Sequence, residues 1–247
     1  MVIQFLSSKL NKSRLIWGLA AMVISFAALS CSKDNEPTPE DETALQQEIG
    51  SIAGLGNEPG TPQGAPFKLP EGVIVDGTIT GDYCEEAAVF IGSGNFVTLC
   101  VGLRNDNDHE ITVTFPGGLI FVSETDEYQN GLVVEEAKIV LPSKKTTRFI
   151  FHTYCGNSSR SPSSSSSVYT FGPVSNSKLI AKLISDLGSK KIAASEYGDG
   201  DDFSDAYYEV LSALQGLVWQ ITDGSKTTDW ETFEYVYKDY LNQLPNK

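Results

Sequence analysis

A change of hydrophobic period between residues 156 and 173 constrains the fold more than any other feature of this chain. Before it, apolar residues alternate with polar or small ones, as in Val97-Thr98-Leu99-Cys100-Val101. A period of two places every second side chain on the same face of a strand. After Pro173 the apolar residues recur three and four positions apart, which is the period of an amphipathic helix. The sequence therefore predicts strands followed by helices, an α+β chain.

The strand region has the spacing of an all-β domain. Apolar, β-branched runs at 97–103, 111–115, 132–141 and 146–154 are separated by turn sequences such as Pro116-Gly117-Gly118 and Asn130-Gly131. Short strands at this spacing are typical of an immunoglobulin-like β-sandwich. We predict such a sandwich over residues 73–155, followed by a Ser-rich, flexible loop at 156–167. A single sandwich that also carries the helices as decoration is the alternative.

Residues 168–247 are predicted to form a small three-helix domain. The first helix has an apolar stripe from Leu179 to Leu187 and ends at Gly188. The second runs from 203 to 222, and the third begins at a capping box made by Thr228 and Glu231. Each helix has only one apolar stripe, so each needs a partner to cover it.

The first thirty residues have the pattern of a secretory signal peptide. Lys9, Lys12 and Arg14 precede an apolar run from 15 to 29. That run is shorter than the roughly 20 residues that span a membrane. The segment from Phe26 to Cys31 resembles a bacterial lipobox, which implies cleavage after residue 30 and lipidation of Cys31. Cleavage without lipidation, which leaves Cys31 as an ordinary thiol, is the alternative.

The segment after Cys31 fits a tether beside a membrane. Residues 31–72 are acidic and Pro-rich, and we expect a flexible linker with one short helix near 43–52. Its start, Ser32-Lys33-Asp34-Asn35-Glu36, resembles the acidic export tags of surface lipoproteins from the Bacteroidetes group. The resemblance implies a lipid-anchored protein of the outer membrane that faces the periplasm or the cell exterior.

Charge limits the partners of the mature chain. Removal of residues 1–30, which carry three basic residues and no acidic residue, changes the net charge from −14 to −17. A field of this sign does not attract nucleic acid. The expected partners are the membrane, through the N-terminal lipid, and a protein or glycan ligand at the cell surface.

The cysteines of the mature chain predict one disulfide and one unpaired thiol. Besides Cys31, the chain contains Cys84, Cys100 and Cys155, and an exported compartment favours disulfides. Cys84 and Cys100 bracket a predicted hairpin with its turn at 92–95, so they are the natural pair. Cys155 is then the odd thiol. Alternatively, Cys155 pairs with one of the other two or is a buried, small apolar residue.

Cys155 and Gln215 form the most informative pair of residues. Cys155 ends a predicted strand, and Gln215 lies at the margin of a helical apolar stripe, one turn before Trp219 and on the side of Tyr208. Tyr154-Cys155 with Asn157, followed by Leu214-Gln215 and Val218-Trp219, resembles the thioester domains of bacterial adhesins over about residues 110–224. Gly156 departs from that pattern, where an apolar residue is expected, and the separation of 60 residues between Cys155 and Gln215 is short.

The resemblance implies a definite chemistry. The thiolate of Cys155 attacks the side-chain amide of Gln215 and expels ammonia, and the thioester then acylates a partner amine or hydroxyl. The expected pocket residues are Tyr154, Asn157, Tyr208 and Trp219. Such a site needs thiolate character at the cysteine and exclusion of water.

Two classes of function therefore compete. The first is a non-enzymatic binding or adhesion protein, acting through a thioester or by non-covalent contacts alone. The second is an exported hydrolase with Cys155 as nucleophile and His152 as base. Residues 152 and 155 have opposite parity in one strand, which disfavours the second class.

No metal site or cofactor is predicted. Four aspartates, at 199, 201, 202 and 205, could bind Ca²⁺ but lack EF-hand spacing. A solvated acidic loop, with Asp202 as a helix N-cap, is the expected structure. Two isolated histidines, His109 and His152, do not make a zinc site.

Overall fold

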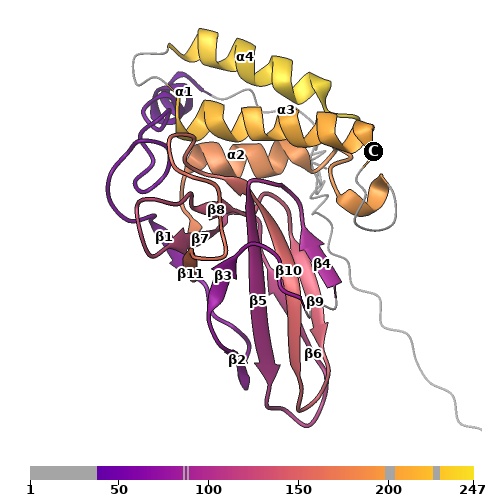
Figure 1. The fold of residues 1–247 in the computed structure, drawn as a ribbon. Helices are drawn as coiled ribbons and strands as arrows, with labels where there is room; N and C mark the ends of the chain where they lie inside the picture. Colours follow the sequence, from indigo (N-terminus) through magenta and orange to yellow (C-terminus); the bar gives the residue numbers. More distant parts are fainter. Residues whose placement is uncertain (1–37, 86, 88, 198–203, 225–228) are drawn as a thin grey trace, which may run out of the picture. The chain divides into compact units, whose positions relative to one another are not determined.

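The structure is a computed structural model that describes residues 38–247 apart from 86, 88, 198–203 and 225–228. Its strands form one large sheet and one two-stranded ribbon, with a layer of helices beside them (Figure 1). The strands are β1 (Gly64–Pro66), β2 (Val73–Val75), β3 (Ile79–Gly81), β4 (Val89–Gly92), β5 (Val97–Asn105), β6 (Ile111–Phe115), β7 (Leu119–Ser123), β8 (Gly131–Leu132), β9 (Ala137–Leu141), β10 (Thr146–Cys155) and β11 (Val168–Ser175). The helices are α1 (Pro39–Gln46), α2 (Lys178–Leu187), α3 (Asp205–Thr222) and α4 (Trp230–Gln243), with a 3-10 turn at Ala194–Glu196.

The large sheet closes on itself. Each neighbouring pair in the ring β5-β3-β11-β7-β8-β10 is antiparallel, and the pairing of β10 with β5 completes it. The longest pairing joins β5 to β10, from Thr146 opposite Arg104 to Thr153 opposite Val97. Strand β2 adds to β5, β1 adds to β11, and β4 runs parallel to β10. The fold is thus a closed six-stranded antiparallel barrel with additional strands.

The predicted immunoglobulin-like sandwich is therefore wrong, although the α+β class holds. Alternation along a strand fixes which residues face the core, but it carries no information on which strands become neighbours. The ring also needs β11, which lies in the segment assigned to the helical domain. The structure starts the helical layer after Ser175 rather than at 168.

Alternate residues of β5 and β10 fill one core together with the ribbon. The β6–β9 ribbon contributes Phe115, whose ring centroid lies 4.9 Å from that of Phe151 and 6.1 Å from that of Phe149. Such edge-to-face and tilted contacts stabilise aromatic cores beyond the area that they bury. The fully buried members of this core include Val97, Leu99, Val101, Leu103, Val113, Leu119, Phe121, Phe149, Phe151 and Cys155.

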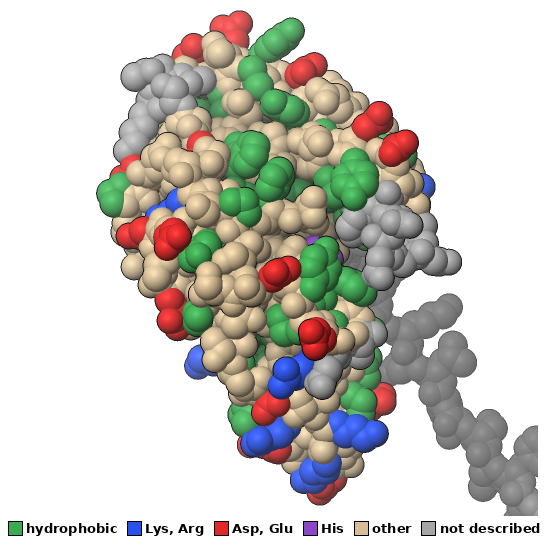
Figure 2. All heavy atoms as spheres, viewed as in Figure 1, with side chains coloured by type: hydrophobic (Ala, Val, Ile, Leu, Met, Phe, Trp, Pro, Cys, Tyr) green, Lys and Arg blue, Asp and Glu red, His purple; other side chains and the backbone are tan. Residues whose placement is uncertain are grey.

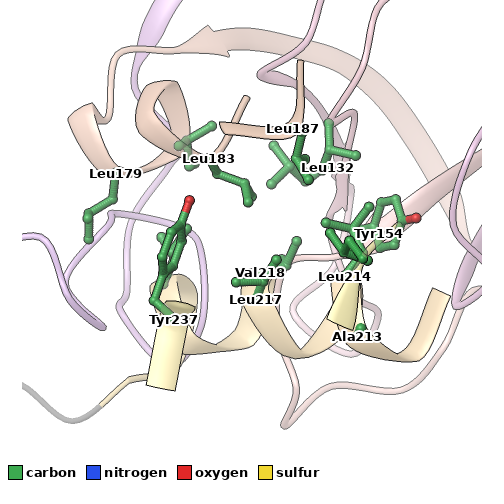
Figure 3. Packing of buried hydrophobic residues seen from close by; sticks show 14 of the residues in the cluster. Leu132, Tyr154, Leu179, Leu183, Leu187, Ala213, Leu214, Leu217, Val218 and Tyr237 are labelled. Atoms are coloured by element: carbon green, nitrogen blue, oxygen red, sulfur yellow. The ribbon is translucent and has the colours of Figure 1, made fainter. Parts of the chain in front are cut away.

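The helices bury a second core against the outside of the barrel. Leu132 and Tyr154 from the strands point toward Leu214 of α3, and Leu183 and Leu187 of α2 lie across from Val218 (Figure 3). These helices begin where polar caps are available: Ser177, Ser204 and Asp229 each accept a hydrogen bond from a backbone N–H of the first turn. The observed cap of α4 is Asp229, and Thr228 of the predicted capping box lies outside the described residues.

Part of the predicted tether belongs to the folded unit. Residues 38–72 contain α1 and β1, and Ile49 and Leu55 are buried in the helical core. Backbone hydrogen bonds also fix this segment, because the N–H of Gly50 donates to the carbonyl of Ile221 over 2.9 Å. Apolar residues at 49, 52 and 55 were the sequence signal for this packing.

The Ser-rich loop at 156–167 is held to the barrel by its own side chains. The hydroxyl of Ser163 accepts from the N–H of Thr98 and donates to its carbonyl, each over 3.0 Å. Ser167 is buried and accepts from the N–H of Ser164. The Ser163 hydroxyl thus bonds to both backbone groups of Thr98 in β5, which composition alone does not reveal.

Candidate functional site

The cysteines divide as predicted into one disulfide and one free thiol. Cys84 and Cys100 are bonded, with their Cα atoms 5.3 Å apart. Cys155 is free and fully buried. Cys31 lies outside the described residues. The structure therefore keeps one sulfur available for chemistry in the folded unit.

Cys155 lies where the barrel meets the helices. It is the last residue of β10, and its backbone pairs with Gly131 of β8. Because side chains alternate along the strand, Cys155 faces the barrel core while Tyr154 faces the helical core. Helix α3 passes the same point, with Leu214 in the helical core and Trp219 against the barrel core.

The side chain of Gln215 is bound to the backbone of Cys155 by two hydrogen bonds. The N–H of Cys155 donates to Oε1 over 2.9 Å, and Nε2 donates to the carbonyl of Cys155, also over 2.9 Å. Gln215 is only 2% exposed. Residues that are 60 positions apart in the sequence are thus in direct contact, and the amide carbon of Gln215 is held beside the cysteine.

Two N–H groups point at the sulfur. Nε1 of Trp219 and the backbone N of Asn157 each lie 3.4 Å from Sγ of Cys155. Burial raises the pKa of the thiol to about 11, these two donors oppose that rise, and the carboxylate of Asp223 adds to it. The thiol is therefore protonated at neutral pH, and its local partners are those that a sulfur anion would use.

Asn157 connects the sulfur to the segment after α1. Its Oδ1 accepts from the N–H of Asn130 over 2.9 Å, and its Nδ2 donates to the carbonyls of Gly54 and Gly56. All three groups are thereby satisfied in the interior. Asn157 is completely buried, so its backbone N–H is fixed relative to Sγ of Cys155.

Residues 50–62, which we call the strap, cover the peptide that follows the cysteine. The N–H of Gly56 donates to the carbonyl of Gly156 over 2.7 Å, and a Cβ on Gly156 would come within 2.8 Å of the Leu55 side chain. Gly56 itself has φ +57°, and a Cβ there would collide with the carbonyl of Thr222. A residue larger than glycine at 156 would therefore press against the Leu55 side chain, which gives a local reason for the departure from the thioester-domain pattern.

Asp223 closes the site on the helix side. It follows the last residue of α3, and its Oδ1 accepts from the N–H and the hydroxyl of Ser158. Sequence reasoning missed Asp223, Asn130, Leu55 and Ser158. Their signals, a helix-terminal Asp-Gly and short loop residues, are common in any protein.

The four predicted pocket residues have different surroundings. Asn157 and Trp219 contact the sulfur directly. Tyr154 is buried on the opposite side of β10, where burial raises the pKa of its phenol. Tyr208 is 48% exposed and so lies apart from the buried group around Gln215.

His152 lies on the other face of β10. Its ring stacks on Phe90 with centroids 5.9 Å apart, and Nδ1 is 3.4 Å from the hydroxyl of Thr98. Burial lowers the pKa of His152 to about 4. The two sides of the strand thus separate His152 from Cys155.

A polar cleft of about 680 Å³ adjoins the strap. One wall is residues 56–62, and the opposite side includes Asn130, Ser159 and Arg160. The strap is also tied across it, because the Ser159 hydroxyl donates to Oδ1 of Asn57 over 2.7 Å. The cleft therefore borders the loop that follows Cys155.

Charged side chains show no continuous basic surface on the face in Figure 2. Lys and Arg side chains gather at the end of this face where β5 and β10 turn, and acidic side chains lie among them. Arg104 is paired with Asp106 and Lys144 with Asp108, each over 2.9 Å.

Within the described part of the chain, no group of three His, Cys, Asp or Glu residues could hold a metal ion. Asp199, Asp201 and Asp202 of the predicted acidic loop lie outside it, and Asp205 is the first residue of α3. No helix among the described residues is long and apolar enough to cross a membrane.

Comparisons with known proteins found no match: no family model, no curated protein and no solved structure is significantly similar to this chain.

Proposed function

We propose that this chain is a lipid-anchored binding or adhesion protein of the cell envelope, in which Cys155 and Gln215 form an internal thioester for covalent attachment to a partner. The observation that carries the proposal is the pair of hydrogen bonds between the Gln215 amide and the backbone of Cys155, which is free and buried. A glutamine amide, a sulfur and two N–H donors meet in a site that excludes bulk water.

The contacts at the site support thioester formation in two respects, since the Gln215 amide is bonded to the backbone of Cys155 and a backbone N–H already donates to Oε1. Sγ of Cys155, once deprotonated, attacks Cδ of Gln215, and the N–H of Cys155 stabilises the negative charge that develops on Oε1. The Cδ–Nε2 bond then breaks, and Nε2 takes up the proton that the thiol has lost and leaves as ammonia. A Cδ–Sγ bond has replaced a Cδ–Nε2 bond, and no oxidant is consumed.

The hydrolase alternative has less support. A Cys–His hydrolase needs the histidine within hydrogen-bond reach of the sulfur, and His152 stacks on Phe90 on the opposite face of β10. Burial also lowers the pKa of His152 to about 4, which makes this imidazole a weak base.

Intact mass of the purified region from residue 38 to 247 tests the thioester. The expected mass is about 17 Da below that of the chain with one disulfide, because one ammonia is lost. Gln215→Ala and Cys155→Ala should each show the unmodified mass for their sequences. A wild-type mass that retains the ammonia would reduce the proposal to a non-covalent binding protein.

The anchor is tested separately in the full chain. Cys31→Ala should abolish labelling by a radioactive fatty acid and move the protein from the membrane fraction to the soluble fraction. Cys84→Ala is the matched control and should stay membrane-bound. Persistent labelling of Cys31→Ala would contradict lipidation at this residue.

A further inference from the structure

The sulfur of Cys155 has two fixed N–H donors in a site that is otherwise unfavourable to a negative charge. Burial and the Asp223 carboxylate both disfavour the thiolate. Tyr169, the other ionisable neighbour, is itself buried and neutral, with its pKa raised to about 12. A site that only stored a buried cysteine would not need N–H groups directed at its sulfur.

Both donors are held in place by contacts on their far sides. The Trp219 ring packs against Phe96 with centroids 5.7 Å apart, and α3 carries it. The Asn157 peptide is fixed through the three side-chain hydrogen bonds of that residue. Donors that are oriented before the reaction stabilise a developing charge without reorganisation.

We propose that Trp219 is a catalytic residue of the thioester reaction, and that its indole N–H, together with the N–H of Asn157, stabilises the sulfur as a leaving group. This inference rests on the proposed thioester. An amine attacks Cδ of Gln215, the Cδ–Sγ bond breaks, and the sulfur leaves with the electron pair between these two N–H groups. The proton released by the amine nitrogen then neutralises the sulfur, leaving an amide and the Cys155 thiol.

Trp219 could instead be only a cover over the sulfur, and the two roles predict opposite effects. Trp219→Phe keeps an aromatic ring beside Phe96 but removes the indole N–H and part of the ring system. Loss of a donor to an anion should slow methylamine addition about tenfold or more. If Trp219 only shields the sulfur from solvent, a smaller ring should leave the rate of methylamine addition unchanged or increase it. Only the slower rate supports a catalytic role.

Trp230→Phe is the matched control. It removes another buried indole N–H, from α4, for which the described residues provide no hydrogen-bond partner. Rates are measured by intact mass at fixed methylamine concentration, starting from protein that shows the loss of ammonia. Retention of that loss in Trp219→Phe also shows that its site is folded. An unchanged or faster rate in Trp219→Phe would overturn the proposal.

A second measurement separates this inference from the thioester itself. In a Gln215→Ala background the thiol has no acyl partner, and methyl methanethiosulfonate, a small apolar reagent, reports thiolate formation against pH. Adding Trp219→Phe should move the midpoint of that profile upward by about one pH unit, which corresponds to a tenfold smaller equilibrium constant for thiolate formation. Adding Trp230→Phe should not. Equal midpoints would show that the indole does not stabilise the sulfur anion, whether or not the wild-type protein forms a thioester.

Discussion

The two sulfur sites beside strand β10 are built in contrasting ways. Cys84 and Cys100 are joined in a disulfide on the outer side of the strand, near exposed Tyr83 and Phe90. Cys155, at the end of the same strand, is fully buried and is contacted by an amide and two N–H donors. One site is thus a cross-link between β5 and the segment that precedes β4, whereas the other holds a free thiol beside the Gln215 amide.

The surroundings of each sulfur account for the difference. Cys100 lies on β5 between Ile150 of β10 and Thr80 of β3, and its sulfur does not ionise because it is part of a disulfide. Around Cys155, the Gln215 amide bonds to the cysteine backbone, and Asn157 joins Asn130 to the strap. A fully satisfied polar network in a core fixes one geometry, which a site for a defined reaction requires.

The largest expected effect separates the two sites by reaction with methylamine. Cys155→Ala and Gln215→Ala should each abolish methylamine incorporation completely, since each removes one end of the proposed bond. The double variant Cys84→Ala/Cys100→Ala should still incorporate one methylamine. Mass spectrometry of the folded proteins measures this incorporation directly. Its loss in the disulfide variant would show that the reaction needs Cys84 or Cys100, which contradicts the assignment to Cys155.

The disulfide should also contribute to stability. It closes a loop with a sequence separation of 16, so its removal should lower the free energy of unfolding by about 3 kcal/mol. Urea unfolding of the same double variant, compared with the wild type, gives the value. A disulfide variant as stable as the wild type would contradict the stabilising role of the Cys84–Cys100 bond.

Acid should destabilise the protein because it protonates His152, on the face of β10 away from Cys155. The pKa of His152 is about 4 in the folded protein and 6.5 for the free group. Between pH 6.5 and pH 4 the unfolded chain therefore binds a proton at this histidine that the folded protein does not bind. Stability should therefore fall as pH decreases from about 6.5 to 4, by up to about 3 kcal/mol. His152→Phe should flatten that dependence, and His109→Asn, at an exposed position, should not. Identical pH profiles for the two variants would contradict the burial argument.

The smallest expected effect concerns Asn157, which links the strap to the loop that follows Cys155. Asn157→Ala keeps the backbone N–H that contacts the sulfur but leaves the N–H of Asn130 without its acceptor. The expected cost is about 2 kcal/mol in unfolding free energy. Asn95→Ala, at an exposed turn, is the control, and equal unfolding midpoints would show that the strap is not held by Asn157.

The disulfide and the helices could be predicted from local patterns. The stripe from Leu179 to Leu187, with Gly188 after it, predicted α2, whose observed C-cap is Gly188. The odd number of cysteines and their spacing predicted the Cys84–Cys100 pair and the free Cys155. The helix signal acts over one turn, so it needs no long-range information. The disulfide prediction is confirmed although the hairpin behind it is wrong, because β4, which precedes the 92–95 turn, pairs in parallel with β10.

The barrel and the full surroundings of the cysteine could not be predicted in this way. Closure depends on β11 pairing with both β3 and β7, which are distant in sequence. The contacts of Asn157 with Gly54 and Gly56 span about 100 residues and involve backbone carbonyls, which leave no trace in residue type. Motif residues indicated the pair Cys155 and Gln215, but only the structure identifies Trp219 and the N–H of Asn157 as the donors to the sulfur.

The most direct test of the central claim is a peptide map of the native protein, digested at mildly acidic pH without reducing agent. The account predicts one cross-linked species that joins the peptide of Cys155 to the peptide of Gln215 with one ammonia lost. A separate species should join Cys84 to Cys100. Linear peptides with a free thiol at Cys155 and an intact amide at Gln215 would contradict the account.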